Sequence, residues 1–246
     1  MPGSCSRRRF ASGMAASLLT ACGWAGGKLR LTSRPGTNPS GCEPGVHPLE
    51  LRRERDTLFY VPKGADPGRE APLVVYLHGA TGSEQQGIKR LSGLAEQLGL
   101  LLLSPASEGG TWDAMQGIYG PDVRMIDQSL SVVFARGRVD SRRIALAGFS
   151  DGGSYALGLG LGNGDLFNAV LAFSPGLIPA GSTQKGTPRV FVSHGRNDRI
   201  LPIEQCSRRI VPELQRAGYP VTYREFEGPH TVPPEIASDA MKWFLG

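Results

Sequence analysis

Ser150 lies in a sequence pattern that favours a reactive serine. The run Gly148-Phe149-Ser150-Asp151-Gly152-Gly153 directly follows the apolar segment 144–147 and precedes a segment suited to a helix. A serine exposed at a strand-to-helix junction needs a sharp, strained turn, and residues without side chains must stand two positions before and after it. Gly148 and Gly152 meet this requirement. The pattern therefore predicts a nucleophile elbow centred on Ser150.

The same five residues could also form an accidental turn, since the chain contains 34 glycines. The surrounding residues decide between the two interpretations. A serine hydroxyl becomes a useful nucleophile when an imidazole takes its proton, and that imidazole needs a carboxylate to fix its tautomer and stabilise its charge. An acid and a histidine do follow Ser150 in the order Ser, Asp, His. This order favours the catalytic interpretation.

The chain has four histidines, and His230 is the best candidate for the base. It follows the last predicted strand in the loop Glu227-Gly228-Pro229-His230-Thr231. His47 lies in a polar N-terminal stretch, where we expect it to be solvated. His78 and His194 each precede a glycine at the end of a predicted strand, and for these we expect structural hydrogen bonds.

Asp198 is the candidate acid, because it lies in a loop after a core strand and ahead of His230. It could instead cap the helix predicted from Pro202, although a capping residue should stand directly before the first turn. Asp165 and Asp151 are weaker candidates for the acid. The first lies beyond the helix that follows the elbow, and the second belongs to the nucleophile turn itself.

A tetrahedral intermediate also needs hydrogen-bond donors at its oxyanion. One expected donor is the backbone amide of Asp151, directly after the nucleophile. The other should come from the loop after the first central strand, with Ala80 as the first candidate and Thr81 as the second. Trp112, in the loop 105–120, is a tentative pocket residue, although a lone tryptophan in a loop is about as often simple packing.

Hydrophobic periodicity places these residues in an α/β fold. Continuous apolar runs predict strands buried on both faces, and apolar residues at helical spacing predict the helices between them. Such regular alternation indicates one domain with a mostly parallel sheet covered on both faces. Only fifteen residues (174–188) separate two core strands, so no large cap domain is expected. Strands are predicted at 49–55, 57–61, 72–77, 100–103, 143–148, 169–173, 190–193 and 221–226, and helices at 84–98, 121–136, 152–161, 202–217 and 234–244.

The basic charge belongs to the N-terminal part of the chain. The formal net charge is +5, but residues 1–55 hold nine Lys and Arg against three Glu, whereas residues 56–246 hold 18 basic and 19 acidic side chains. Nothing in the folded part therefore indicates nucleic-acid binding. No metal or organic cofactor is expected either, and the oligomeric state is left open.

The first residues resemble a bacterial export signal. Ser6-Arg7-Arg8-Arg9-Phe10 resembles a twin-arginine motif, and the mildly apolar stretch 11–21 is too short to span a bilayer. Leu19-Thr20-Ala21-Cys22 resembles a lipobox, which implies a lipid on Cys22; an ordinary cleaved signal is the alternative. We expect an export signal (1–21), a flexible tether (22–48) and a catalytic domain (49–246), anchored at the periplasmic or extracellular face of the cell envelope.

Two further cysteines allow two interpretations. Cys42 and Cys206 could pair as a disulfide in an oxidising compartment. Cys206 also suits a buried helix position, where a free cysteine behaves as a small hydrophobic residue. Both alternatives remain open from the sequence.

The motifs together resemble the phospholipase/carboxylesterase branch of the α/β-hydrolase superfamily, over roughly residues 57–246. The resemblance rests on His78-Gly79, the elbow 148–153, the stretch 194–202 and Gly228-Pro229-His230. It implies a serine carboxylester hydrolase without metal or organic cofactor, and it assigns nucleophile, acid and base to Ser150, Asp198 and His230.

Some features, notably Gly120-Pro121-Asp122-Val123, are also similar to secreted polyester depolymerases and feruloyl esterases. Asp151 departs from the better-known members, in which glutamine or asparagine is frequent, and a carboxylate there could raise the barrier. Thioesterase, lysophospholipase and depolymerase activities need the same residues. A non-catalytic binding protein on this fold is the competing class.

Overall fold

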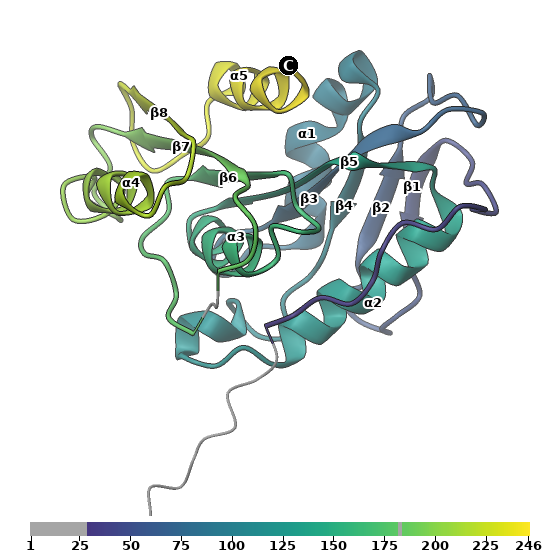
Figure 1. Ribbon diagram of the computed structural model, residues 1–246, viewed down its shortest axis with the longest axis horizontal. Coiled ribbons are helices and arrows are strands. Elements are labelled where there is room, and N and C mark those ends of the chain that lie inside the picture. The colour runs from purple at the N-terminus through teal and green to yellow at the C-terminus, as the bar shows by residue number, and fades with distance from the viewer. Residues whose placement is uncertain (1–28, 182–183) are drawn as a thin grey trace, which may run out of the picture.

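The computed structural model describes residues 29–181 and 184–246. The predicted export signal and Cys22 lie outside the described residues. In the described part, three strands come first, and from the third strand onward helices separate successive strands except the sixth and seventh (Figure 1). The strands are β1 (Gly45–Pro48), β2 (Leu58–Val61), β3 (Ala71–Leu77), β4 (Leu101–Ser104), β5 (Val139–Phe149), β6 (Ala169–Phe173), β7 (Arg189–Gly195) and β8 (Val221–Phe226). The helices are α1 (Glu84–Leu98), α2 (Pro121–Arg136), α3 (Asp151–Gly162), α4 (Ser207–Arg216) and α5 (Pro234–Leu245), with a short 3-10 helix, η1, at Asp113–Gln116.

The strands form one eight-stranded sheet in the order β1-β2-β4-β3-β5-β6-β7-β8. β1 and β2 pair antiparallel at one edge, β2 is antiparallel to β4, and all other neighbours are parallel. The mostly parallel sheet predicted from the apolar runs is therefore confirmed. The parallel strands β3, β5, β6, β7 and β8 all have their carboxyl ends on the same side of the molecule. Open α/β sheets bind their ligands just beyond these carboxyl ends.

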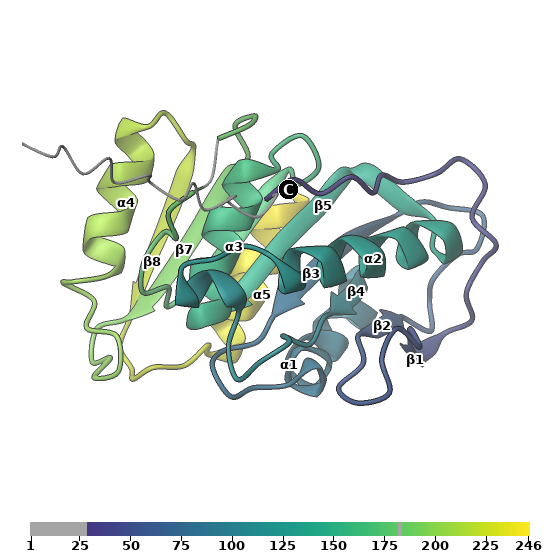
Figure 2. The same ribbon diagram turned by 90° about the horizontal axis from the view of Figure 1, so that it is seen from below.

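Helices cover both faces of the sheet, as predicted (Figures 1 and 2). One apolar core contains buried residues of α2, α3 and α4, and the other contains those of α1 and α5. Strand side chains alternate between these two cores, which is why the central strands contain continuous apolar runs. The described residues between β6 and β7 form no helix or strand, in agreement with the expected absence of a large cap.

The first predicted strand, 49–55, is wrong. The antiparallel edge strand is β1, and residues 49–57 form the connection from β1 to β2. Glu50 and Arg55 adopt left-handed backbone conformations (φ 60° and 50°), which a strand does not contain. The Asp56 carboxylate accepts the amides of Glu50 and Leu51, at 2.5 and 3.1 Å. These side-chain hydrogen bonds stabilise a turn, although the alternation of apolar and charged residues at 49–55 favoured a strand.

The predicted tether is also corrected, for residues 29–48. Leu29 and Leu31 are buried in the core beneath α2 and α3, at 7% and 1% exposure. The buried Asn163 side chain accepts the Leu31 amide at 2.9 Å and donates to the Leu29 carbonyl at 3.0 Å. Further along, the segment follows α2 to β1 (Figure 1). The polar composition suggested a linker, but two leucines and one asparagine dock the segment on the domain.

The cysteines do not form the proposed disulfide, since both are free. Cys42 lies beside Val61 of β2, whereas Cys206 directly precedes α4, which packs on β7 and β8. Five strand spacings separate β2 from β7, or roughly 24 Å. A disulfide needs Cα atoms within about 7 Å. Cys206 is buried, as the alternative interpretation expected.

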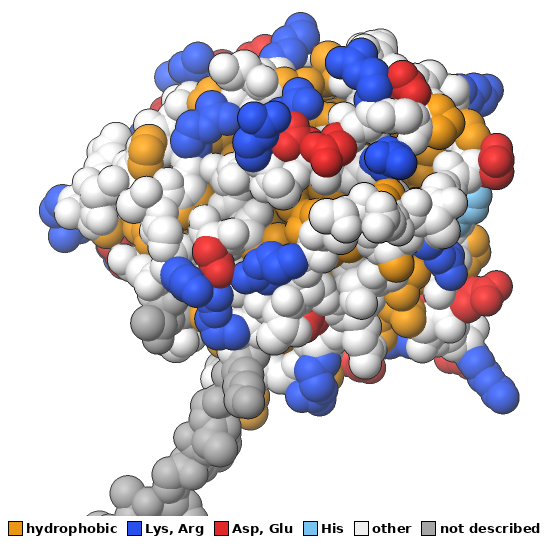
Figure 3. Space-filling view, turned by 45° about the vertical axis from the view of Figure 1, so that its right-hand side comes forward, with side chains coloured by type: hydrophobic (Ala, Val, Ile, Leu, Met, Phe, Trp, Pro, Cys, Tyr) orange, Lys and Arg blue, Asp and Glu red, His pale blue; other side chains and the backbone are white. Residues whose placement is uncertain are grey.

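No helix in the described residues is long and apolar enough to cross a membrane. Figure 3 shows basic and acidic side chains interspersed among hydrophobic and uncharged groups on the face that it displays.

Candidate active site

The elbow has the strained geometry that the sequence predicts. Ser150 joins β5 to α3 with φ 57° and ψ −121°, in a region that non-glycine residues rarely adopt. A Cβ on Gly148 would lie 2.1 Å from the Gly152 carbonyl oxygen, and one on Gly152 would lie 2.2 Å from the Leu77 carbonyl oxygen. Neither position therefore accepts a side chain while the turn is kept.

The structure brings Ser150, His230 and Asp198 together. Ser150 Oγ lies 2.9 Å from His230 Nε2, and His230 Nδ1 lies 2.5 Å from Asp198 Oδ2. The three residues follow β5, β8 and β7, whose carboxyl ends share one edge of the sheet. Ser150 and Asp198 are buried and His230 is partly buried. This linear arrangement can move a proton from the hydroxyl to the imidazole.

Asp198 is held as an ionised hydrogen-bond acceptor. Its Oδ1 accepts the backbone amides of Ile200 and Leu201 at 2.9 and 2.8 Å, which leaves Oδ2 for His230. Burial by itself favours the neutral acid, but the hydrogen bonds from Leu201 and His230 outweigh it and lower the pKa of this carboxyl below its usual range. The carboxylate does not cap α4, which begins only at Ser207.

His194, expected to have a structural role, contacts the acid. Its Nε2 lies 2.8 Å from the Leu201 carbonyl and 3.2 Å from Asp198 Oδ2, and its Nδ1 lies 2.6 Å from Ser207 Oγ. Since a carbonyl only accepts, the hydrogen-bond network assigns the proton to Nε2. Burial lowers the pKa of His194 and keeps the ring neutral at neutral pH. Sequence reasoning missed this contact, although His194, near the end of β7, is only four residues before Asp198.

The two predicted oxyanion donors lie close to Ser150. Asp151 is the first residue of α3, so its amide has no acceptor within the helix. Ala80 follows Gly79, at which an added Cβ would lie 3.3 Å from Ser150 Cβ. The alternative donor, the Thr81 amide, is engaged with the Gly110 carbonyl at 2.6 Å. Among the described residues, the amides of Ala80 and Asp151 donate to no other group. Both are free for an oxyanion.

Trp112 does not line a pocket, which corrects its tentative assignment. It is fully buried, at 0% exposure, and its ring packs between His78 and Tyr155 with centroid distances of 4.9 and 5.2 Å. Its Nε1 donates to the His78 carbonyl at 2.8 Å. Since its Nε1 is already bonded and its ring packs against His78 and Tyr155, Trp112 supports the loop after β3 from within the core.

His78 is structural, as expected. Its Nδ1 donates to the Gly79 carbonyl at 2.8 Å, and its Nε2 accepts the Ser107 amide at 3.1 Å. Burial lowers its pKa, so it too is neutral at neutral pH. Sequence reasoning missed Arg55, which donates to the Gly82 carbonyl at 2.9 Å and thereby holds the same loop.

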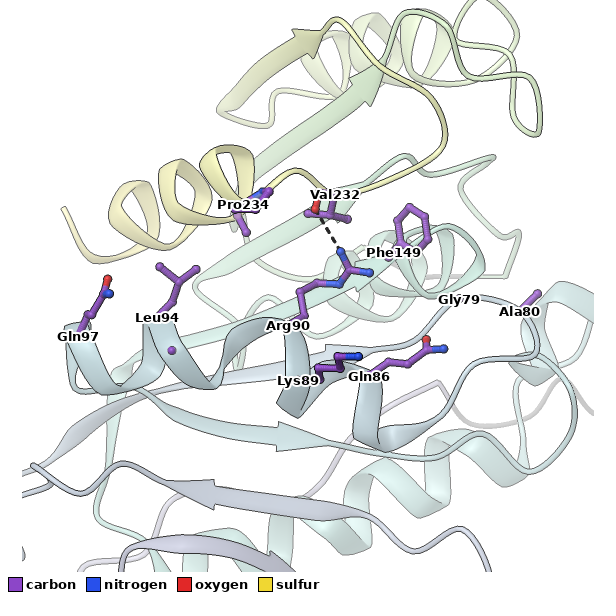
Figure 4. A pocket seen from close by; sticks show the side chains of 12 residues that line it. Gly79, Ala80, Gln86, Lys89, Arg90, Leu94, Gln97, Phe149, Val232 and Pro234 are labelled. Atoms are coloured by element: carbon purple, nitrogen blue, oxygen red, sulfur yellow. Dashed lines mark hydrogen bonds between the residues drawn. The ribbon is translucent and has the colours of Figure 1, made fainter.

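A groove of about 820 Å³ runs between α1 and α5 and reaches Ala80 and Phe149, beside Ser150 (Figure 4). The Phe149 ring packs against His230 at 4.7 Å. Arg90 lies over Phe149 and donates to the Val232 carbonyl at 3.2 Å. The groove is lined by Gly79, Ala80, Gln86, Lys89, Arg90, Gly93, Leu94, Gln97, Phe149, Val232, Pro234 and Ala237. Sequence reasoning did not find this groove, because its walls come from four separate segments.

No group of three or more His, Cys, Asp or Glu in residues 29–181 and 184–246 is arranged to hold a metal ion.

Two curated proteins resemble part of the chain. Bifunctional acetylxylan esterase/xylanase XynS20E of Neocallimastix patriciarum is 29% identical over 159 residues, which cover 61% of this chain and 22% of that protein. Probable feruloyl esterase C of Aspergillus terreus is 27% identical over 158 residues, which cover 61% of this chain and 57% of that protein. The matched part is thus less than two thirds of either relative.

A solved structure shows the fold of this chain, and a family model shows its family. The crystal structure of S-formylglutathione hydrolase (FrmB) from Staphylococcus aureus matches with a TM-score of 0.66 at 15% identity, covering 86% of this chain and 100% of that chain. This likeness shows the predicted fold. The family model described as Phospholipase/Carboxylesterase matches residues 118–244, more than half of the chain and including the elbow, Asp198 and His230. The chain therefore belongs to the phospholipase/carboxylesterase family of the α/β-hydrolase fold.

Proposed function

We propose that this protein is a serine carboxylester hydrolase that acts through an acyl-enzyme on Ser150. The observation that carries the proposal is the continuous contact from Ser150 Oγ through the His230 ring to Asp198, at 2.9 and 2.5 Å. The strained conformation of Ser150 adds support. A non-catalytic binding protein has no physical need for such strain.

The first half of the reaction forms the acyl-enzyme. Ser150 Oγ attacks the ester carbonyl carbon while His230 Nε2 takes the hydroxyl proton, and Asp198 stabilises the imidazolium. The carbonyl oxygen becomes an oxyanion that accepts hydrogen bonds from the amides of Ala80 and Asp151. When the tetrahedral intermediate collapses, His230 returns its proton to the alkoxide, and the alcohol leaves.

The second half uses the same groups with water. His230 takes a proton from a water molecule, whose oxygen attacks the acyl carbon, and the Ala80 and Asp151 amides again hold the oxyanion. Collapse breaks the bond to Ser150 Oγ, which regains its proton from His230. The product is a carboxylic acid, and the free enzyme is restored without any cofactor.

The groove between α1 and α5 opens beside Ser150, so it can hold the substrate beyond the ester bond. Its apolar residues, including Leu94, Phe149 and Val232, suit an acyl chain or an aromatic ring. The names of the two relatives direct attention to acetyl and feruloyl esters. Thioesters, lysophospholipids and polyester ends are alternative substrates for the same triad.

The first experiment is hydrolysis of p-nitrophenyl esters from acetate to a long-chain acyl group, together with methyl ferulate, by the purified full-length protein. We expect turnover of at least one ester class and covalent labelling of Ser150 by a fluorophosphonate, located by mass spectrometry. A folded protein that neither hydrolyses any of these esters nor reacts with the fluorophosphonate would favour the binding-protein class instead.

We also propose that the chain is exported and anchored to the bacterial cell envelope through a lipid on Cys22. The support is the sequence pattern alone, since residues 1–28 lie outside the described residues. Cys22→Ala should move the protein from the membrane fraction to the soluble fraction without changing kcat. Cys42→Ala serves as the matched control. Equal membrane association of the Cys22 variant and the parent would refute the anchor.

A further inference from the structure

We propose that residues 110–112 form an oxyanion clamp, which holds both predicted oxyanion donors in position, and that Thr111 offsets the negative charge of Asp151. The inference rests on the proposed function and adds positioning residues to it. The clamp lies in the loop between β4 and α2, more than thirty positions from Ser150 in the sequence.

Three consecutive residues of this loop make the contacts. The Gly110 carbonyl accepts the Thr81 amide at 2.6 Å, and the Trp112 indole donates to the His78 carbonyl at 2.8 Å. These two bonds hold the turn that presents the Ala80 amide. Between them, Thr111 Oγ1 donates to Asp151 Oδ2 at 2.5 Å. One short segment therefore contacts both sides of the oxyanion site.

The Asp151 side chain presents an electrostatic problem to the proposed reaction. The backbone amide of Asp151 stabilises a developing negative charge, whereas its carboxylate, carried by the same residue, repels that charge. In the described part of the chain, no Lys or Arg forms an ion pair with Asp151. The Thr111 hydroxyl is the hydrogen-bond donor that the structure provides. It fixes the carboxylate and draws part of its charge toward the loop.

The clamp is itself held rigidly, as a positioning element must be. Asp122, which is 1% exposed, accepts the amides of Glu108 and Asp113, both at 2.7 Å, on either side of the clamp. Asp113 in turn accepts the Tyr155 hydroxyl at 2.9 Å, from α3 directly beyond the elbow. The loop ends are therefore tied to the helix that carries the nucleophile turn.

The test compares Thr111→Val, which keeps the side-chain shape but loses the hydroxyl, with Thr111→Ser, which keeps the hydroxyl. We expect Thr111→Val to lower kcat roughly tenfold to a hundredfold with little change in KM, because an oxyanion site acts only in the transition state. Thr111→Ser should retain most of the activity. Binding of phenylboronic acid, which forms a tetrahedral anion on the serine, should weaken in parallel with kcat.

A second substitution separates charge compensation from mere structural support. Asp151→Asn removes the charge that Thr111→Val leaves without its hydrogen-bond donor, so the double variant Thr111→Val/Asp151→Asn should recover most of the lost kcat. A purely structural role predicts no recovery, because the hydroxyl stays absent. Equal kcat for the Val and Ser variants, or no recovery in the double variant, would overturn the clamp. An inactive wild-type protein would instead show that the proposed function itself is wrong.

Discussion

Replacing Ser150 with alanine is expected to lower kcat by about 10⁴-fold or more while the protein stays folded. The reaction needs an oxygen nucleophile 2.9 Å from His230 Nε2, and alanine supplies none. Residual hydrolysis then comes only from the oxyanion donors and substrate binding. The measurement is kcat on the best ester of the p-nitrophenyl series, together with circular dichroism and urea unfolding.

The matched control for this variant is Ser141→Ala. Ser141 is an exposed residue of the same strand β5, far along the strand from the elbow. Its replacement removes one hydroxyl group without touching the site, so kcat should stay at the wild-type value. If the Ser150 variant retained more than about one tenth of the activity, the nucleophile assignment and the acyl-enzyme mechanism would both be wrong.

Asp198→Asn is expected to lower kcat by about 10⁴-fold with a small effect on KM. An asparagine of the same shape can still accept the amides of Ile200 and Leu201 through its carbonyl oxygen. Its NH₂ group then faces His230 Nδ1 and favours the tautomer with the proton on Nε2, which cannot accept the serine proton. The low pKa of Asp198 means that the wild-type group stays ionised at neutral and mildly acidic pH.

Asp165→Asn provides the comparison, because Asp165 is the other aspartate that the sequence left as a candidate. Its carboxylate lies within 2.8 to 3.2 Å of Arg30, Arg34 and Lys185, and not at the triad. We expect its replacement to weaken docking of residues 29–34 and to leave kcat unchanged. An Asp198 variant that lost less than tenfold in kcat would remove Asp198 from the mechanism.

The sequence alone predicted the central architecture because each part of it rests on local patterns. Helices α1 and α2 begin and end at the residues predicted from apolar spacing, and Pro121 stands in the first turn of α2. Strand β3 and residues 144–147 of β5 read as apolar runs, since both of their faces are covered, whereas β5 begins earlier than predicted and its residues 141–143 are exposed. The elbow was predicted because its glycines stand at fixed positions on either side of Ser150 in the sequence, although the backbone contact that requires Gly152 is with Leu77 of β3.

The tertiary structure decided the features that depend on contacts between distant segments. Residues 29–48 look like a linker by composition, yet Leu31 and Asn163 lie 132 positions apart and meet in the core. Trp112 could not be assigned to a pocket or to packing until His78 and Tyr155 were placed on its two sides. The Thr111–Asp151 hydrogen bond could not be predicted either. Thr111 lies in a loop, and a loop has no periodic pattern that would show which other segment it contacts.

The physical reason for this division is the range of the interactions. Backbone geometry, strand alternation and helix periodicity act over a few residues, so they can be read along the chain. Side-chain hydrogen bonds such as those of His194 and Thr111 depend on which segments lie next to each other in the folded chain. The packing of the whole core determines that arrangement, so it cannot be read from a few neighbouring residues. The sequence thus determined which residues can perform the chemistry, and the folded chain decided which residues hold them in place.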